Sequence, residues 1–125
     1  MCLVVSSNHR CVNGKFVPVA ATKDLLVFKI VRLNEIDPLH SYSQFCNFQY
    51  AANTLYKKRK LRPVKEVVFG AGFHAYLRRP YAYHCSYGTK RVEFIIPAGS
   101  TVFFGTDGDI VSNQIKSGNL EAICV

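Results

Sequence analysis

The sequence has few acids, no long apolar run and no closely spaced cysteine pair. Eight Asp and Glu residues stand against sixteen Lys and Arg among 125 residues, which gives a net charge of +8. Such a charge favours an anionic partner, namely nucleic acid, a nucleotide or a membrane surface. No apolar run approaches the roughly 20 residues of a membrane span. The start, MCLVVSSNHR, lacks the basic region and long apolar core of a secretory signal. We therefore expect a cytoplasmic protein with no membrane partner.

The five cysteines are odd in number and widely scattered, and no CxxC occurs. This pattern argues against a disulfide framework and against a structural zinc site. No phosphate-binding loop, RNA-recognition or helix-turn-helix signature is present either, so we predict no metal and no cofactor. Cys2 is the cysteine with a possible chemical role, because removal of Met1 would give it a free amine beside its thiol. The alternative is a packed residue near the chain start.

Length and pattern predict a single domain, residues 1–125. Apolar runs between turn residues predict strands, and Asn13-Gly14 predicts a tight hairpin turn. A short helix is expected over 79–87, because Pro80 suits its first turn and Gly88 its end. The predicted fold class is α+β: a compact, mostly antiparallel sheet of about seven short strands with one or two short helices. The strands are expected at 2–6, 24–33, 66–76, 91–97, 101–104, 110–115 and 120–125.

The stretch VVFGAGFHAY, residues 67–76, combines a strand pattern with two glycines and a histidine. Glycines within a strand indicate a bulge or a close approach of another backbone or a ligand. His74 is a candidate acid, base or phosphate donor in a partly apolar pocket, or else a core histidine with satisfied ring nitrogens. Lys29, in the middle of the strand 24–33, either extends to an edge or points into a polar pocket toward an anion.

The positive charge is concentrated in one part of the chain. Residues 57–91 contain ten Lys and Arg against the single acid Glu66. Within this range, residues 57–65 (KKRKLRPVK) form what we call the basic segment. One prediction is a basic module that binds nucleic acid or a host protein through the basic segment. The alternative is a solvated loop that keeps the protein soluble.

Several short boxes resemble a group of small uncharacterised proteins from phages and gut-bacterial genomes. These boxes are the MCL start, the strand entry at 21–24, GFHAY at 72–76, IIPAGS at 95–100 and GDIVS at 108–112. The order of the boxes is also similar to a reduced ADP-ribosyltransferase core, in which these strands surround NAD. Asn113-Gln114-Ile115 offers no catalytic glutamate where that core has one, so ADP-ribose transfer is not expected.

The resemblance implies a phage-type anti-defence protein acting in the host cytoplasm. Such a protein binds and neutralises a nucleotide immune messenger, cyclic or ADP-ribose-like, by sequestering or cleaving it, and can act as a homo-oligomer. If it is an enzyme, it is a phosphodiesterase or nucleotidase in which His74, Tyr76 and Cys2 are catalytic. The expected ligand-binding residues are Lys29, His74, Arg78, Arg79, Arg91, Ser112 and Asn113.

Overall fold

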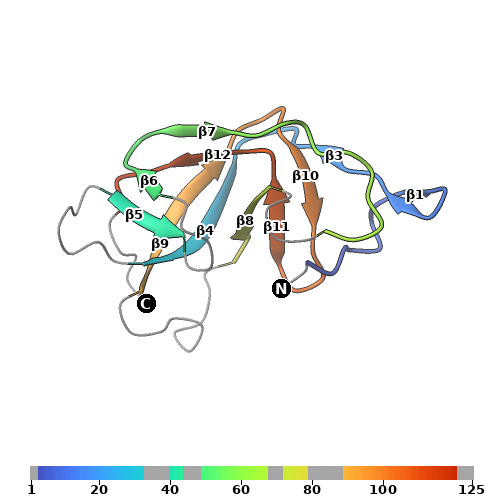
Figure 1. Cartoon of the computed structure of the whole chain (residues 1–125), viewed down its shortest axis with the longest axis horizontal. Helices are drawn as coiled ribbons and strands as arrows, with labels where there is room; N and C mark the ends of the chain where they lie inside the picture. Colours follow the sequence, from blue (N-terminus) through green and yellow to red (C-terminus); the bar gives the residue numbers. More distant parts are fainter. Residues whose placement is uncertain (1–2, 33–39, 44–48, 68–71, 79–88, 121–125) are drawn as a thin grey trace.

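The computed structural model describes residues 3–32, 40–43, 49–67, 72–78 and 89–120. These residues form twelve strands, and all their pairings are antiparallel (Figure 1). The strands are β1 (Cys11–Val12), β2 (Lys15–Phe16), β3 (Val19–Ala20), β4 (Leu25–Arg32), β5 (His40–Ser43), β6 (Gln49–Ala51), β7 (Leu55–Lys57), β8 (Phe73–Tyr76), β9 (Thr89–Ile96), β10 (Thr101–Phe104), β11 (Asp109–Ser112) and β12 (Gln114–Ser117).

The main sheet curls back on itself. Strand β11 pairs with β8, β8 with β4, β4 with β9, and β9 with β12. The path begins at β11 and ends at β12. Only Asn113 separates these two strands, so the last strand of the path is joined directly to the first. The bend between β11 and β12 is visible in Figure 1, where β12 runs along the top of the molecule. The result is a small barrel-like ring, with β10 and β3 continuing beyond β11 and β7 beside β12.

The larger apolar core lies on the inner face of this ring. Val27 and Val31 of β4 and Val92 and Phe94 of β9 belong to it and are almost completely buried. Their alternation with exposed residues such as Ile95 is the period of two expected of strands that bury one face. Eight residue pairs join β4 to β9, which makes this the longest strand pairing among the described residues.

A second, smaller core lies on the other face of β10 and β11. Its buried members are Leu3, Val67, Phe103 and Val111. Leu61 and Val64 pack against these residues from the basic segment. The basic segment is therefore held against the sheet by its own apolar side chains.

The predicted α+β fold class is wrong, because the described residues are all-β. Residues 50–56, which the sequence leaves open between helix and strand, contribute to β6 and β7 and turn at Asn53, whose φ is +52°. The predicted strand 110–115 is divided at Asn113. The helix expected at 79–87 and most of the strand expected at 120–125 lie outside the described residues. The described strands instead satisfy their backbone groups by pairing with one another.

Other local predictions are confirmed. The strand 101–104 has the predicted bounds, and those of β4 and β9 differ from prediction by one or two residues. Asn13 and Gly14 both have positive φ, +54° and +76°, as a tight two-residue hairpin turn requires. The glycine-rich stretch is confirmed as a strand only over Phe73–Tyr76. Residues 3–5 make isolated bridges, Leu3 with Val67 and Val5 with Gly105, in place of a regular strand.

Candidate anion-binding site

The basic segment follows β7, and backbone hydrogen bonds hold it to the sheet at its start. The Lys58 N–H donates to the Asn113 carbonyl at 2.7 Å. Three residues later, the Leu61 N–H donates to Thr101 Oγ1 at 3.0 Å. These two contacts fix the backbone on either side of Arg59 and Lys60.

The end of the basic segment is held by the N-terminal part of the chain. Val64 and Phe16 exchange two backbone hydrogen bonds, of 2.7 and 3.0 Å. Just beyond the segment, the Leu3 N–H donates to the Val67 carbonyl at 3.1 Å. The backbone from 58 to 67 is therefore fixed by partners from three separate parts of the chain.

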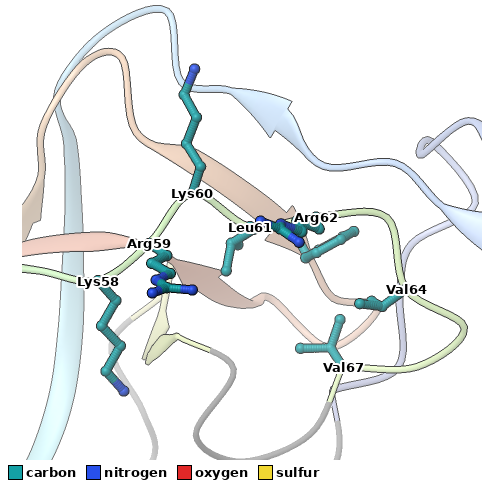
Figure 2. Close-up of a pocket in the computed structure, with 8 residues that line it drawn as sticks. Lys58, Arg59, Lys60, Leu61, Arg62, Val64 and Val67 are labelled. Atoms are coloured by element: carbon teal, nitrogen blue, oxygen red, sulfur yellow. The ribbon is translucent and has the colours of Figure 1, made fainter.

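A hollow of about 330 Å³ lies along this fixed backbone. Its apolar floor comes from the second core, and Phe103 is only 2% exposed there. Figure 2 shows the cationic side chains around it, with Lys58 and Lys60 pointing in opposite directions and Arg59 between them. The residues that line it are Lys58, Arg59, Lys60, Leu61, Arg62, Val64, Val67 and Phe103.

The four cations of the hollow are all exposed, and no acidic side chain lines it. The Lys58 ammonium lies 4.8 Å from the centre of the Phe73 ring, a cation–π distance. Because Phe73 belongs to the larger core, this contact holds the Lys58 ammonium away from the apolar floor of the hollow. With no acid to neutralise them, these charges create a local positive potential to which an anion is attracted.

Ser112 and Asn113, two of the predicted ligand-binding residues, are buried at the break between β11 and β12. The Thr101 N–H donates to Asn113 Oδ1 at 2.8 Å, and Ser112 Oγ donates to the Gln114 carbonyl at 2.7 Å. Their polar atoms are thus used to turn the strand. The backbone carbonyl of Asn113 accepts a hydrogen bond from the Lys58 N–H, so this turn is joined to the start of the basic segment.

The other central candidates are Lys29 and His74, whose side chains project from opposite faces of the sheet. Lys29 is 8% exposed, alternates with the core residues of β4, and donates to the backbone carbonyl of His74. Its ammonium is 5.6 Å from the centre of the Tyr50 ring, within the larger core. The His74 side chain alternates with Phe73 and Ala75, which face that core, so the imidazole lies on the second face.

His74 nevertheless lies in register with the floor of the hollow. It pairs with Val111, and Val111 pairs with Phe103. Cross-strand partners project from the same face, so His74 is two strand spacings, about 10 Å, from Phe103. Tyr76 shares this face of β8, which brings two of the predicted catalytic residues together.

Arg91 also lies on this face of the sheet. It is 8% exposed and pairs with Ile30, which the antiparallel register of β4 and β8 places opposite His74. The other predicted residues are dispersed. Arg78 is exposed and lies against the turn at Gly108, where an added β-carbon would be 3.1 Å from Arg78 Nε. Arg79 and Cys2 lie outside the described residues.

Two ionisable groups near the sheet have shifted pKa values. Burial raises the pKa of the Asp109 carboxyl above its ordinary value, and the neighbouring charge of Asp107 adds to the shift against opposing backbone hydrogen bonds. Burial lowers the pKa of the Lys90 ammonium. Neither group lines the hollow.

The sequence did not single out His9, which is buried and joins the N-terminal segment to β10. The Phe104 N–H donates to His9 Nε2 at 2.8 Å, so Nε2 carries no proton. The proton is therefore on Nδ1, which donates to the Val17 carbonyl at 2.9 Å. The imidazole thus bridges two backbone groups and acts as a structural link between the N-terminal segment and β10.

Comparison of the chain with protein-family models, with curated proteins and with solved structures gives no match. Within the described ranges, no helix is long and apolar enough to cross a membrane. No group of three or more His, Cys, Asp and Glu side chains in those same ranges is placed to hold a metal ion. The hollow and its charges are therefore the features from which a function can be inferred.

Proposed function

We propose that this protein binds nucleic acid by its phosphates, through the basic segment. The observation that carries the proposal is the set of four exposed cations on a fixed backbone around one hollow. Lys and Arg are the side chains that neutralise phosphates, and such contacts supply most of the affinity in binding that does not depend on sequence.

The directions of the side chains favour a long anion over a single phosphate. Lys58 and Lys60 point to opposite sides of the segment in Figure 2, so their ammonium groups do not converge on one point. A polymer with regularly spaced phosphates can meet each charge in turn. A phosphate monoester would meet only one or two of them.

The fixed backbone supports a binding surface over a solvated loop. The hydrogen bonds at Lys58, Leu61 and Val64 are made within the protein, so binding does not need to order the chain around the charges. An interaction surface that is ordered beforehand loses less entropy on binding. A loop that served only solubility would need no such anchoring.

A small nucleotide is the second candidate ligand, and two observations favour it. The hollow has the volume of the smaller ligand pockets in proteins. His74 and Tyr76 share the face of the sheet that forms its floor. An immune messenger sequestered there would place its phosphates on Lys58–Arg62, with His74 at the far side of the floor.

The test compares two double variants with equal loss of charge. Lys58→Gln/Lys60→Gln removes two cations from the hollow, and Lys23→Gln/Lys116→Gln removes two exposed cations elsewhere. Binding of a labelled nucleic acid is followed by fluorescence anisotropy over a salt series. We expect the first variant to weaken binding about tenfold and to reduce the salt slope by about 1.8, since each phosphate contact contributes about 0.9. The control variant should bind as the wild type does.

The second candidate is tested by incubation with cyclic di- and trinucleotides, NAD and cyclic ADP-ribose isomers, followed by chromatography before and after heat denaturation. If the wild-type protein retains one of these nucleotides, His74→Ala abolishes that retention, and the wild-type protein does not bind nucleic acid, the second proposal replaces the first. If the wild-type protein binds nucleic acid, and both His74→Ala and the control variant bind it equally well, the result supports the first proposal. If neither kind of ligand binds, both proposals fail.

A further inference from the structure

The hairpin β1–β2 continues the basic segment on its open side. It forms a separate two-stranded sheet, with Cys11 paired to Phe16 and Val12 to Lys15. It extends from the body at the right of Figure 1. The antiparallel bridge between Phe16 and Val64 attaches it to the end of the basic segment.

This bridge brings two lysines near each other. Lys15 precedes Phe16 and Lys65 follows Val64, so the two lysines flank the same end of the antiparallel bridge. Phe16 and Val64 pack against the second core, so the flanking lysines project toward solvent, and both are exposed. Like charges brought near one another across paired strands are unfavourable unless an anion lies between them.

The hairpin adds charge of one sign only. Residues 3–20 contain Arg10 and Lys15 and no acid, and the basic segment contains six cations and no acid. Arg10 is exposed, and its carbonyl accepts a hydrogen bond from the Val17 N–H at 2.9 Å across the base of the hairpin. The hairpin therefore adds two cations, Arg10 and Lys15, next to the end of the basic segment.

Among the described residues, the surface of the basic segment and the hairpin has no fully exposed aromatic ring on which an unpaired base could stack. Proteins that hold single strands combine cations with exposed aromatic rings on which bases stack. Among the described residues, the exposed large apolar side chains are all aliphatic, and Phe103 in the floor of the hollow is buried. Within the described residues, the surface offers exposed cations to phosphates, and the ring of Phe16 is half-buried against the second core.

We infer that the ligand is a double-stranded nucleic acid, held by its phosphates between the basic segment and the hairpin β1–β2 without reading its sequence. This inference rests on the proposed function and adds to it the form of the nucleic acid and a second contact region. A duplex suits two regions of cations, because it presents two phosphate backbones on either side of a groove.

The test uses a labelled mixed-sequence DNA duplex and one of its strands alone, over the same salt series. The variant Arg10→Gln/Lys15→Gln is compared with the charge-matched Lys23→Gln/Lys116→Gln and with Arg10→Lys/Lys15→Arg, which keeps both charges. We expect the wild type to bind the duplex more tightly than the single strand. The first variant should lower the salt slope for the duplex by about 1.8, while the other two leave it unchanged.

Each other result overturns a defined part of the argument. Tighter binding of the single strand, or an unchanged slope in Arg10→Gln/Lys15→Gln, would overturn the inference while the role of Lys58 and Lys60 stands. Failure of wild-type protein to bind either DNA form would overturn the proposed function and the inference together. Thermal melting of each variant checks that the hairpin changes leave the fold intact.

Discussion

Strand β8 and the basic segment differ in how they use their polar groups. Around β8, several polar groups are hydrogen-bonded within the fold: the carbonyl of His74 accepts from Lys29, and Ser112 and Asn113 hold the adjoining turn. In the basic segment the backbone is equally well held, yet the charged ends of the side chains remain exposed. The difference teaches that a ligand site needs a fixed backbone and polar groups that the fold has not already used.

The largest expected effect on stability separates the two regions most sharply. In Gly72→Ala, the new β-carbon would lie 2.7 Å from the Ser112 carbonyl oxygen and 2.8 Å from Val111 Cγ1. Since the first of these is backbone, relief requires β8 and β11 to separate, and we expect a loss of about 3 kcal/mol in the free energy of unfolding. Urea denaturation measures this loss. The affinity of the folded Gly72→Ala protein for nucleic acid should equal that of the wild type. A clear loss of affinity would mean that β8 is part of the binding surface.

The next effect is smaller and tests the turn that supports the hollow. Asn113→Ala removes the acceptor of the Thr101 N–H but keeps the backbone carbonyl that anchors Lys58. Leaving that partly buried N–H without its partner should cost about 1 to 2 kcal/mol, seen as a lower melting temperature. Asn113→Asp keeps an acceptor oxygen and is the matched control. Equal melting of Asn113→Ala and wild type would contradict the structural role given to this side chain.

A single change in the basic segment should affect binding and leave stability unaltered. Lys60→Gln removes one exposed charge, and we expect the salt slope for nucleic acid binding to fall by about 0.9. The melting temperature should stay that of the wild type, because the Lys60 side chain is exposed. An unchanged slope would mean that Lys60 faces no phosphate. The charge-conserving Lys60→Arg is the control.

The smallest effect concerns pH. Because burial raises the pKa of Asp109, the folded protein holds this proton more tightly than the unfolded chain does. The stability contributed by Asp109 is therefore present below the unfolded pKa of about 4 and is lost as the pH rises through the folded value. We expect Asp109→Asn to melt slightly higher than wild type at neutral pH and at the same temperature near pH 3. A difference that is equal at both pH values would contradict the burial of this carboxylate.

Local patterns predicted the parts of the fold that depend on near neighbours. The Asn13-Gly14 turn follows from the ease with which these residues adopt positive φ, and the strand 101–104 from its apolar residues between turn signals. The glycines of the stretch 67–76 predicted a bulge or a close approach of another backbone or a ligand, and of these Gly72 shows the close approach of a backbone, at the Ser112 carbonyl. The break at Asn113 could not be predicted, because it depends on a partner, Thr101, from another strand.

The sequence predicts the positive charge of the candidate site but not which residues form its floor. The concentration of Lys and Arg in 57–65 is a property of the sequence, and those residues line the hollow. The floor of the hollow, Val67 and Phe103, could not be assigned to it, because these residues look like ordinary core. Lys29 and His74 look like partners in the sequence, yet strand alternation and the curl of the sheet send their side chains to opposite faces.

The sequence by itself determined the positive charge, its concentration in one segment, the hairpin turn and the central strands, because each depends on residues close together in the chain. Only the tertiary structure decided that β11 and β12 close the sheet into a ring, and that Phe16 pairs with Val64 to bring the hairpin to the basic segment. These are contacts between distant residues. They are selected by the burial of two apolar cores and the pairing of backbone groups, which no local pattern records.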